Sequence, residues 1–457
     1  MNRLLTSAPL LLAGVLGVAI LAACGNDGIC DAVELSDALA AASPGTTVSL
    51  GECQVSGSFT VPAGVTLTGS GPASRIVASG GPALVVTPGR EAPTVSNLAI
   101  SSAESTGVLA VGTGAIVISS VRVDVSKGVA LRLESLSAAT LSDITLTGPV
   151  TAELAGTLPP MPDSALTATH GLVVIDSSAV SLERVNISAF ARFGALAINS
   201  TLSWAGGGAS DTLGVGFMAD GGAATLRDTS FCRVFSGLRP YPAYGLVFTG
   251  GAASVTDGVT LCENEGYGML QNGGTAAHVD LVGTANREPA VWIQDSTDFA
   301  LSGTGSIFSD NALAGIVVVS STNVRISDAQ INASSLATRI VDVGGSVRVG
   351  DGVHLVVEDA AAVTLTNVTL TDNTRAGLLL DFSTGSPDAM DLSSVTVDGT
   401  GTSLGAIAQD AAGLITSGTW DRNITRRGAT LANDAALVGR LDVVGIVGPM
   451  FLPPAAM

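Results

Sequence analysis

Hydrophobic and polar positions alternate along most of this chain, and the alternation returns at a nearly fixed step. In residues 363–380, VTLTNVTLTDNTRAGLLL, apolar residues alternate with Thr and Asn, a polar turn is centred on Asp372 and Asn373, and a glycine opens a second apolar run. Such alternation is typical of a strand, and the Asn/Gly cluster is typical of a turn. The same spacing, an apolar residue seven positions before a strand-opening glycine, occurs at Ile100/Gly107, Val121/Gly128, Ile187/Gly194, Leu261/Gly268, Phe308/Gly315 and Leu370/Gly377. Steps of 21 to 23 residues between successive glycines predict the coils of a parallel β-helix.

The composition agrees with this solenoid better than with ordinary globular domains. Of 457 residues, 46% are apolar but only 4% are aromatic, and 56 are glycine. A narrow coil interior favours Val, Ile, Leu and Ala, with Gly, Ser, Thr and Asn at the corners. From Phe59 to about Val447 we expect strands joined by short turns.

The N-terminal segment carries a targeting signal. Arg3 precedes an apolar run that ends in Leu21-Ala22-Ala23-Cys24, which resembles a bacterial lipoprotein signal with its lipobox. The resemblance implies cleavage after residue 23, a lipid on Cys24 and, because Gly25 follows, an outer-membrane lipoprotein facing the periplasm or the cell surface. A single transmembrane anchor is the alternative, but small residues lead into Cys24 and no basic flank follows the run. Which leaflet carries the protein stays open.

An extracytoplasmic location allows disulfides between the four remaining cysteines. Cys30 and Cys53 bracket a segment whose Asp31 and Glu34 resemble a capping box, followed by helical spacing up to Ser43-Pro44-Gly45. We expect residues 24–58 to hold the lipidated N-terminus and a helix that caps the first coil, closed by a Cys30–Cys53 bridge.

Cys232 and Cys262 occupy equal positions in successive repeats. Equal register puts their Cα atoms about 4.8 Å apart, the spacing between strands. That distance suits a disulfide. A disulfide and a stacked pair of thiols both remain open.

The segments LSDALAAASPGTTVSLGE and GSFTVPAGVTLTGSG resemble the start of right-handed parallel β-helix proteins of the pectin-lyase-like class. The resemblance implies an all-β, right-handed, single-stranded parallel β-helix over residues 59–447, a short N-terminal capping helix, and a C-terminal tail over residues 448–457. This fold hosts lyases, hydrolases, adhesins and stalks, so it does not define an activity.

Three segments interrupt the repeat: residues 148–170, 237–244 and 382–391. The first two leave the rod at the same corner, and loops gathered on a regular scaffold often form binding sites. Ordinary excursions, with tyrosines covering the flank of the rod, are the alternative. The residues that we expect to line a glycan-binding groove are Arg192, Phe193, Arg239, Tyr241, Tyr244, Trp292 and Asp295.

The chain changes character after Gly413. It gathers Trp420 and several arginines and ends in the apolar sequence VVGIVGPMFLPPAAM. Prolines at 449, 453 and 454 prevent further strand pairing. Capping of the last coil is the favoured interpretation, and docking of a partner is the alternative.

Polar residues recur at the ends of the glycine-led strands. Their carboxylates can attract Ca²⁺, which prefers several oxygen ligands, but turn chemistry explains the same residue types more simply. We therefore expect no obligatory cofactor or metal and leave Ca²⁺ open. These residues are Asp176, Asn199, Asp295, Ser320 and Asp410.

The chain contains only parts of the residue sets that act in catalytic relatives of this fold. Val291-Trp292-Ile293-Gln294-Asp295 resembles the VWIDH stretch of pectate lyases, but Gln and Asp replace its Asp and His. Of the polygalacturonase pattern only His170-Gly171 is found, and we expect Trp292 at the surface. Neither His278 nor His354 has partners at metal-ligand spacing. With a net charge of −19 and a single lysine, the chain is unsuited to nucleic acid.

These observations favour a lipid-anchored, non-catalytic β-helix at the bacterial surface that acts in adhesion, in glycan binding or as a structural stalk. The alternative is a divergent polysaccharide lyase or glycoside hydrolase of the pectin-lyase-like fold. The membrane, through the lipid, and a cell-surface or environmental glycan are the expected partners. The ligand, partner proteins and oligomeric state stay open.

Overall fold

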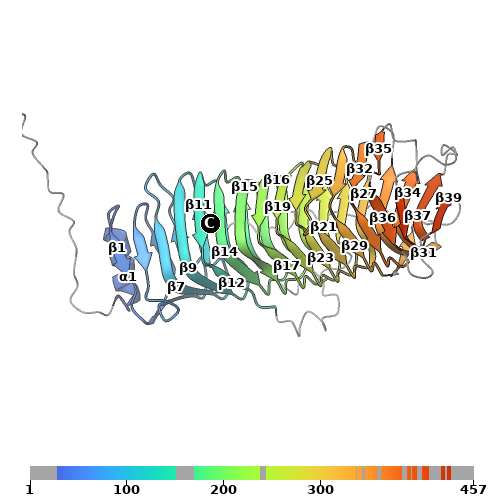
Figure 1. Ribbon diagram of the computed structural model, residues 1–457. Coiled ribbons are helices and arrows are strands. Elements are labelled where there is room, and N and C mark those ends of the chain that lie inside the picture. Colours follow the sequence, from blue (N-terminus) through green and yellow to red (C-terminus); the bar gives the residue numbers. More distant parts are fainter. Residues whose placement is uncertain are drawn as a thin grey trace, which may run out of the picture.

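The computed structural model describes residues 28–150, 169–236, 243–335, 337–341, 345–357, 362–382, 389–392, 394–398, 404–410, 424–427 and 430–433. Helix α1 (Ala32–Ala41) lies at one end, and the strands stack behind it into a rod that ends at β39 (Thr430–Asn433) (Figure 1). Strand pairing between successive coils is parallel and in register. The expected parallel β-helix with a short capping helix is therefore confirmed.

The strands form three parallel stacks. We call the first the glycine-led sheet, because glycines lie at or just before the start of many of its strands. It comprises β3 (Phe59–Val61), β6 (Leu84–Val86), β8 (Val108–Val111), β10 (Gly128–Glu134), β13 (Thr169–Ile175), the beginnings of β15 (Phe193–Ser210) and β16 (Val215–Arg227), β18 (Tyr244–Thr249), β21 (Tyr267–Asn272), β24 (Val291–Gln294), β27 (Leu313–Val319), β31 (Gly345–Val357), β34 (Ala376–Phe382), β37 (Leu404–Asp410) and β39.

The second sheet follows the glycine-led strand of each coil, and long strands bend from it into the third. It comprises β1 (Thr47–Ser49), β4 (Thr66–Thr68), parts of β7 (Thr94–Ser102), β9 (Ala115–Val125), β14 (Val180–Ser188), β15 and β16, then β11 (Ala138–Ser142), β19 (Ala253–Asp257), β22 (Thr275–Val279), β25 (Asp298–Ser302), β28 (Val324–Ser327), β32 (Ala362–Thr366) and β35 (Ala389–Asp391).

The third sheet completes each coil. It comprises β2 (Gln54–Ser56), β5 (Arg75–Ala78), the ends of β7, β9, β14 and β15, then β12 (Thr145–Thr147), β17 (Ser230–Cys232), β20 (Thr260–Cys262), β23 (Val282–Thr284), β26 (Ile307–Ser309), β29 (Gln330–Asn332), β33 (Thr369–Thr371), β36 (Val395–Asp398) and β38 (Ile424–Arg427). One further strand, β30 (Ala337–Val341), pairs with β31 in the antiparallel sense.

The cap forms as its sequence predicts. The carboxylate of Asp31 accepts hydrogen bonds from the backbone N–H groups of Val33 and Glu34, at 2.9 and 3.0 Å, which satisfies donors that a helix start leaves open. Leu35 and Leu39 are buried against the first coil. Parallel pairing already begins at β1, so the first coil lies beside the cap rather than after Phe59.

The four cysteines among the described residues form two disulfides. Cys30–Cys53 joins the cap to the first coil, with a Cα–Cα distance of 5.8 Å. Cys232–Cys262 joins β17 to β20 in equal register, with a Cα–Cα distance of 4.5 Å. The question that the sequence left open for this second pair is thus resolved in favour of a disulfide.

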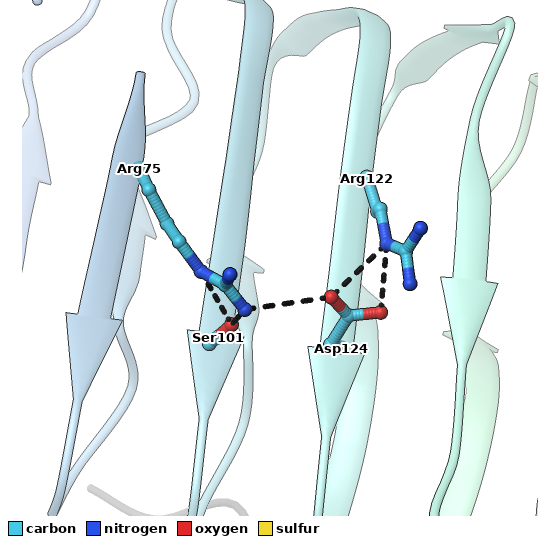
Figure 2. Close-up of polar contacts among 4 residues, drawn as sticks. All are labelled: Arg75, Ser101, Arg122 and Asp124. Carbon is cyan, nitrogen blue, oxygen red and sulfur yellow. Dashed lines mark hydrogen bonds and ion pairs between the residues drawn. The ribbon is translucent and has the colours of Figure 1, made fainter. Parts of the chain in front are cut away.

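Polar side chains also connect neighbouring coils on the outside of the rod. Figure 2 shows Arg75 of β5 donating to the Ser101 hydroxyl of β7 at 2.6 Å and lying 3.7 Å from the Asp124 carboxylate of β9. Arg122 of β9 reaches the same carboxylate at 3.0 Å. The Arg122–Asp124 pair lies within β9, whereas Arg75 reaches across to two neighbouring coils. Such exposed pairs each contribute little stability.

Among the described residues, no helix combines the length and apolar character needed to cross a membrane.

Candidate functional site

The glycine-led sheet is apolar on both faces. On β16, Phe217 and Ala219 pack in the interior of the coil, whereas Met218 between them belongs to a separate buried cluster. Successive side chains of a strand point to opposite faces, so Met218 lies on the outside of the sheet. The register of the sheet aligns it with one residue from each neighbouring strand. This outer row consists of Arg132, Val173, Leu196, Met218, Val247, Leu270, Trp292, Val317, His354, Leu379 and Ile407.

The outer row is buried along its length. Arg132 is 7% exposed and the other members are at most 2% exposed. In a parallel sheet that is covered on both faces, the sequence of each strand is a near-continuous apolar run, as Leu172-Val173-Val174 is here. The side chains on both faces of this sheet are therefore buried.

Four of the seven residues predicted to line a groove fall on or beside this face. Phe193, Tyr244 and Trp292 belong to the outward cluster, and each is at most 1% exposed. The sequence-based expectation of a surface position for Trp292 is wrong, because both faces of its strand are covered. Arg192 precedes β15 and is 6% exposed.

The remaining predicted residues lie elsewhere. Asp295 is exposed, just after β24. Arg239 and Tyr241 lie outside the described residues, as do Cys24 and the larger part of the 148–170 insertion. The structure gathers the aromatic residues on one face but does not present their rings to solvent.

A basic cluster occupies the end of the outer row nearest the cap. It contains Arg132 of β10, His170 of β13, and Arg192 and Phe193 at the start of β15. Arg132 donates from Nε to the Glu134 carboxylate at 2.6 Å. The His170 ring stacks on Phe193, with ring centroids 5.5 Å apart. Both guanidinium groups are near enough for their charges to act on the imidazole, and Arg132 is paired with one carboxylate.

The imidazole of His170 is neutral at ordinary pH. Burial, together with the positive charges of Arg192 and Arg132, lowers its pKa to about 3. Neither ring nitrogen has a hydrogen-bond partner. A neutral imidazole here can accept or donate a hydrogen bond to a bound group, but a pKa so far below 7 makes it a weak general base.

From the sequence, Arg132 was missed, and His170-Gly171 was found only as an isolated part of the polygalacturonase pattern. The signal was available in the register, because His170 and Phe193 hold equivalent positions, one residue before the glycines at 171 and 194. Arg132 lies within the apolar strand VALRLE, where a charged residue requires a partner.

The polar residues at strand ends are turn residues. Asp176, Asn199, Asp295 and Ser320 all have φ between 45° and 52°, the left-handed region that Asn and Asp tolerate better than most residues. Asp410 ends β37, and its side chain lies outside the description. Within the described part of the chain, no group of three His, Cys, Asp or Glu side chains is placed to share a metal ion.

No protein-family model matches this chain, and no curated protein matches it. Among solved structures, similarity is found to the A-module of the Azotobacter vinelandii mannuronan C-5 epimerase AlgE6, with 15% identity, a TM-score of 0.39, and coverage of 89% of this chain and 96% of that one. A mutant of the periplasmic alginate epimerase AlgG has 13% identity, a TM-score of 0.38, and coverage of 80% and 82%. The catalytic unit of a GH87 α-1,3-glucanase from Streptomyces thermodiastaticus has 13% identity, a TM-score of 0.32, and coverage of 90% and 68%.

These neighbours are right-handed parallel β-helix proteins of the pectin-lyase-like class, the class that the sequence resembles. The likeness concerns the fold.

Proposed function

We propose that this protein is a lipid-anchored extracytoplasmic rod that binds a glycan, or serves as a stalk or adhesin, without catalysing a reaction. The observation that carries the proposal is that the ionisable side chains are either paired with one another or buried. Outside the core, arginines pair with carboxylates of a neighbouring coil: Arg184 with Asp143 at 2.6 Å, and Arg233 with Asp211 at 2.8 Å. These groups fasten coils together.

The histidines support the same proposal. His170 and His278 are buried, and the pKa of each is lowered to about 3. Efficient acid–base catalysis needs a group that titrates near the working pH. Neither imidazole meets that condition.

A second candidate function is glycan cleavage at the basic cluster. It is favoured by the unpartnered ring nitrogens of His170, whose ring feels the positive charges of Arg132 and Arg192. Such a combination suits an anionic sugar. A bound anion would raise the pKa of His170 toward the working range. His170 is fully buried, so such a ligand reaches the ring only after the side chains around it move.

Glycan-array binding combined with a reducing-sugar assay separates the two candidates. The mature ectodomain, residues 25–457, should bind one class of glycan and release no new reducing ends. Release of product that His170→Gln abolishes and Asn186→Gln, an exposed control, does not would overturn the non-catalytic proposal. For the anchor, Cys24→Ser should abolish incorporation of a labelled fatty acid and release the chain from membranes; continued labelling would contradict it.

A further inference from the structure

A row of polar side chains lies beside the buried outer row, on the same face of the glycine-led sheet. Each member follows a residue of the outer row by two positions, as Gln294 follows Trp292, and therefore lies on the same side of the sheet. Strand register aligns the members across four neighbouring coils, about 4.8 Å apart. We call this row the polar strip, and it consists of Asp220, Thr249, Asn272 and Gln294.

Hydrogen bonds orient the side chains at one end of the polar strip. The buried indole of Trp292 donates from Nε1 to Oε1 of Gln294 at 3.0 Å, and Gln294 donates from Nε2 to Oδ1 of Asn272 at 2.9 Å. The Asn272 amide therefore accepts through its oxygen and turns its two Nδ2 protons the other way. A side chain that is already held in place loses little conformational entropy when it donates to a ligand.

The polar strip is accessible where the outer row is not. Asp220 and Asn272 are half-buried, whereas every member of the outer row is buried. Two glycines follow each of Thr249 and Asn272, and among them Gly251 and Gly273 have φ of 77° and 71°, the left-handed region that glycine adopts without strain. A Cβ on Gly251 would meet nothing within 4 Å. The chain beside the strip therefore has no side chain here that would hinder a ligand.

The polar strip offers both kinds of hydrogen-bonding group and no positive charge. Asp220 supplies acceptors, Thr249 a hydroxyl that donates and accepts, and Asn272 donors. Sugar hydroxyls also donate and accept, and a charged acceptor strengthens the bond. A sugar carboxylate, in contrast, would bring a negative charge close to Asp220 in a chain whose net charge is −19. The combination favours an uncharged glycan.

The polar strip is separate from the basic cluster. Arg132 lies on β10, and β13 and β15 lie between that strand and β16, which carries Asp220. Three strand spacings amount to about 14 Å. In the row of the strip, Ile175 and Ile198 occupy this interval. Substitutions can therefore test the two places independently.

We propose that the polar strip binds an uncharged glycan that lies across the strands, along the axis of the rod. This inference rests on the glycan binding proposed above and adds the place and the chemical class of the ligand. Because each coil contributes one side chain, the ligand must span about 10 Å to contact Asp220, Thr249 and Asn272 together. A chain of several sugar units meets that condition.

Binding of defined oligosaccharides to the mature chain, residues 25–457, tests the proposal. Cellohexaose, mannohexaose and laminarihexaose serve as uncharged probes and hexagalacturonate as an anionic probe, all in isothermal titration calorimetry. We expect at least one uncharged probe to bind, with an affinity about ten-fold or more above that of hexagalacturonate.

Two substitutions test the strip itself. Asn272→Asp keeps the acceptor for Gln294 but removes the donors, so the uncharged probe should bind about ten-fold more weakly. Asp220→Ala should have a similar effect, because it removes the charged acceptor. The exposed controls Asn186→Asp and Asp257→Ala should leave the affinity unchanged. Melting temperatures close to that of the parent chain establish that each variant is folded, and Asp220→Asn replaces an Asp220→Ala chain that is not.

Unchanged affinity in both strip variants would mean that the glycan binds elsewhere, which overturns this inference and leaves the proposed function standing. A preference for hexagalacturonate that Arg132→Gln weakens would move the ligand to the basic cluster, with the same result. Binding of none of the uncharged probes also overturns the inference. Only the absence of binding to any glycan on the array counts against both proposals.

Discussion

Asn264 donates from Nδ2 to Oδ1 of Asn286 on the next coil at 2.8 Å, and both side chains are completely buried. Asn286 in turn donates from Nδ2 to Asn311 at 2.8 Å and to the Leu261 carbonyl at 3.2 Å. Its Oδ1 also accepts from the backbone N–H of Asn264. Every donor and acceptor of the Asn286 amide is therefore used, so this polar ladder inside an apolar rod is self-sufficient.

Replacing Asn286 by Ala should lower the free energy of unfolding by about 3 kcal/mol, because it leaves buried groups on Asn264, Asn311 and the backbone without partners. Urea titration followed by circular dichroism measures the loss. The exposed Asn186→Ala should change stability by less than about 0.5 kcal/mol. Equal effects of the two substitutions would show that the ladder does not stabilise the rod.

The glycines at the starts of the strands predict that Gly→Ala substitutions at different positions will differ in their effect on stability. A Cβ on Gly245 would lie 2.6 Å from the Gly268 carbonyl oxygen, whereas a Cβ on Gly80 would meet nothing within 4 Å. Gly245→Ala should therefore cost about 1–3 kcal/mol as coils are pushed apart. Gly80→Ala should be neutral or slightly stabilising. Thermal unfolding of the two variants checks this, and a neutral Gly245→Ala would contradict the close stacking.

Stability should fall in acid before most carboxylates titrate. Burial lowers the pKa of His278 from 6.5 to about 3, and His170 behaves alike. Between these values the unfolded chain binds protons that the folded chain does not, so the free energy of unfolding decreases as pH drops from about 6.5 toward 3. The slope is about 1.4 kcal/mol per pH unit for each histidine.

Chemical denaturation at several pH values measures that slope. Thr256 hydrogen-bonds the His278 ring at 2.8 Å, so the control replaces both, as Thr256→Val with His278→Leu. It should lose roughly half of the slope that the two histidines contribute. Parallel pH curves for the control and the parent chain would refute the assignment.

Loss of the Cys232–Cys262 bridge should destabilise the middle of the rod. It closes 30 residues, which corresponds to about 3.5 kcal/mol on the chain-entropy model. Cys232→Ser with Cys262→Ser should lower the melting temperature and admit protease near β17 and β20. The matched pair Cys30→Ser and Cys53→Ser should instead expose the cap. Identical cleavage patterns for the two double variants would argue against local action of each bridge.

The interior of the rod could be predicted from sequence because it obeys simple periodicity. The alternation of apolar and polar residues predicted that Leu365 and Leu370 lie inside the rod, as they do. The regular spacing of glycines predicted the stacking of coils. The asparagine ladder could not be read as easily, because Asn264 and Asn286 look like turn residues until neighbouring coils place them in line.

The outer row shows where the sequence argument failed. Trp292 was expected at the surface after residues 291–295 were compared with the VWIDH stretch of pectate lyases. Its strand, Val291–Gln294, is buried on both faces. Only the continuous apolar run distinguishes this condition in the sequence. The basic cluster was missed for a related reason, since Arg132 and His170 are 38 positions apart and only register brings them close.

The coil between β11 and β14 has a further consequence. Leu141 and Leu182 stack directly although 41 residues separate them, whereas Leu182 and Trp204 on the next pair of coils are 22 apart. The strands on either side of this longer connection keep their register, with Leu146 paired to Ile187 and Gly128 paired to Thr169. Lengthening a loop whose ends are already fixed costs little, so a domain inserted between Val150 and Thr169 should leave the stacking of the coils intact.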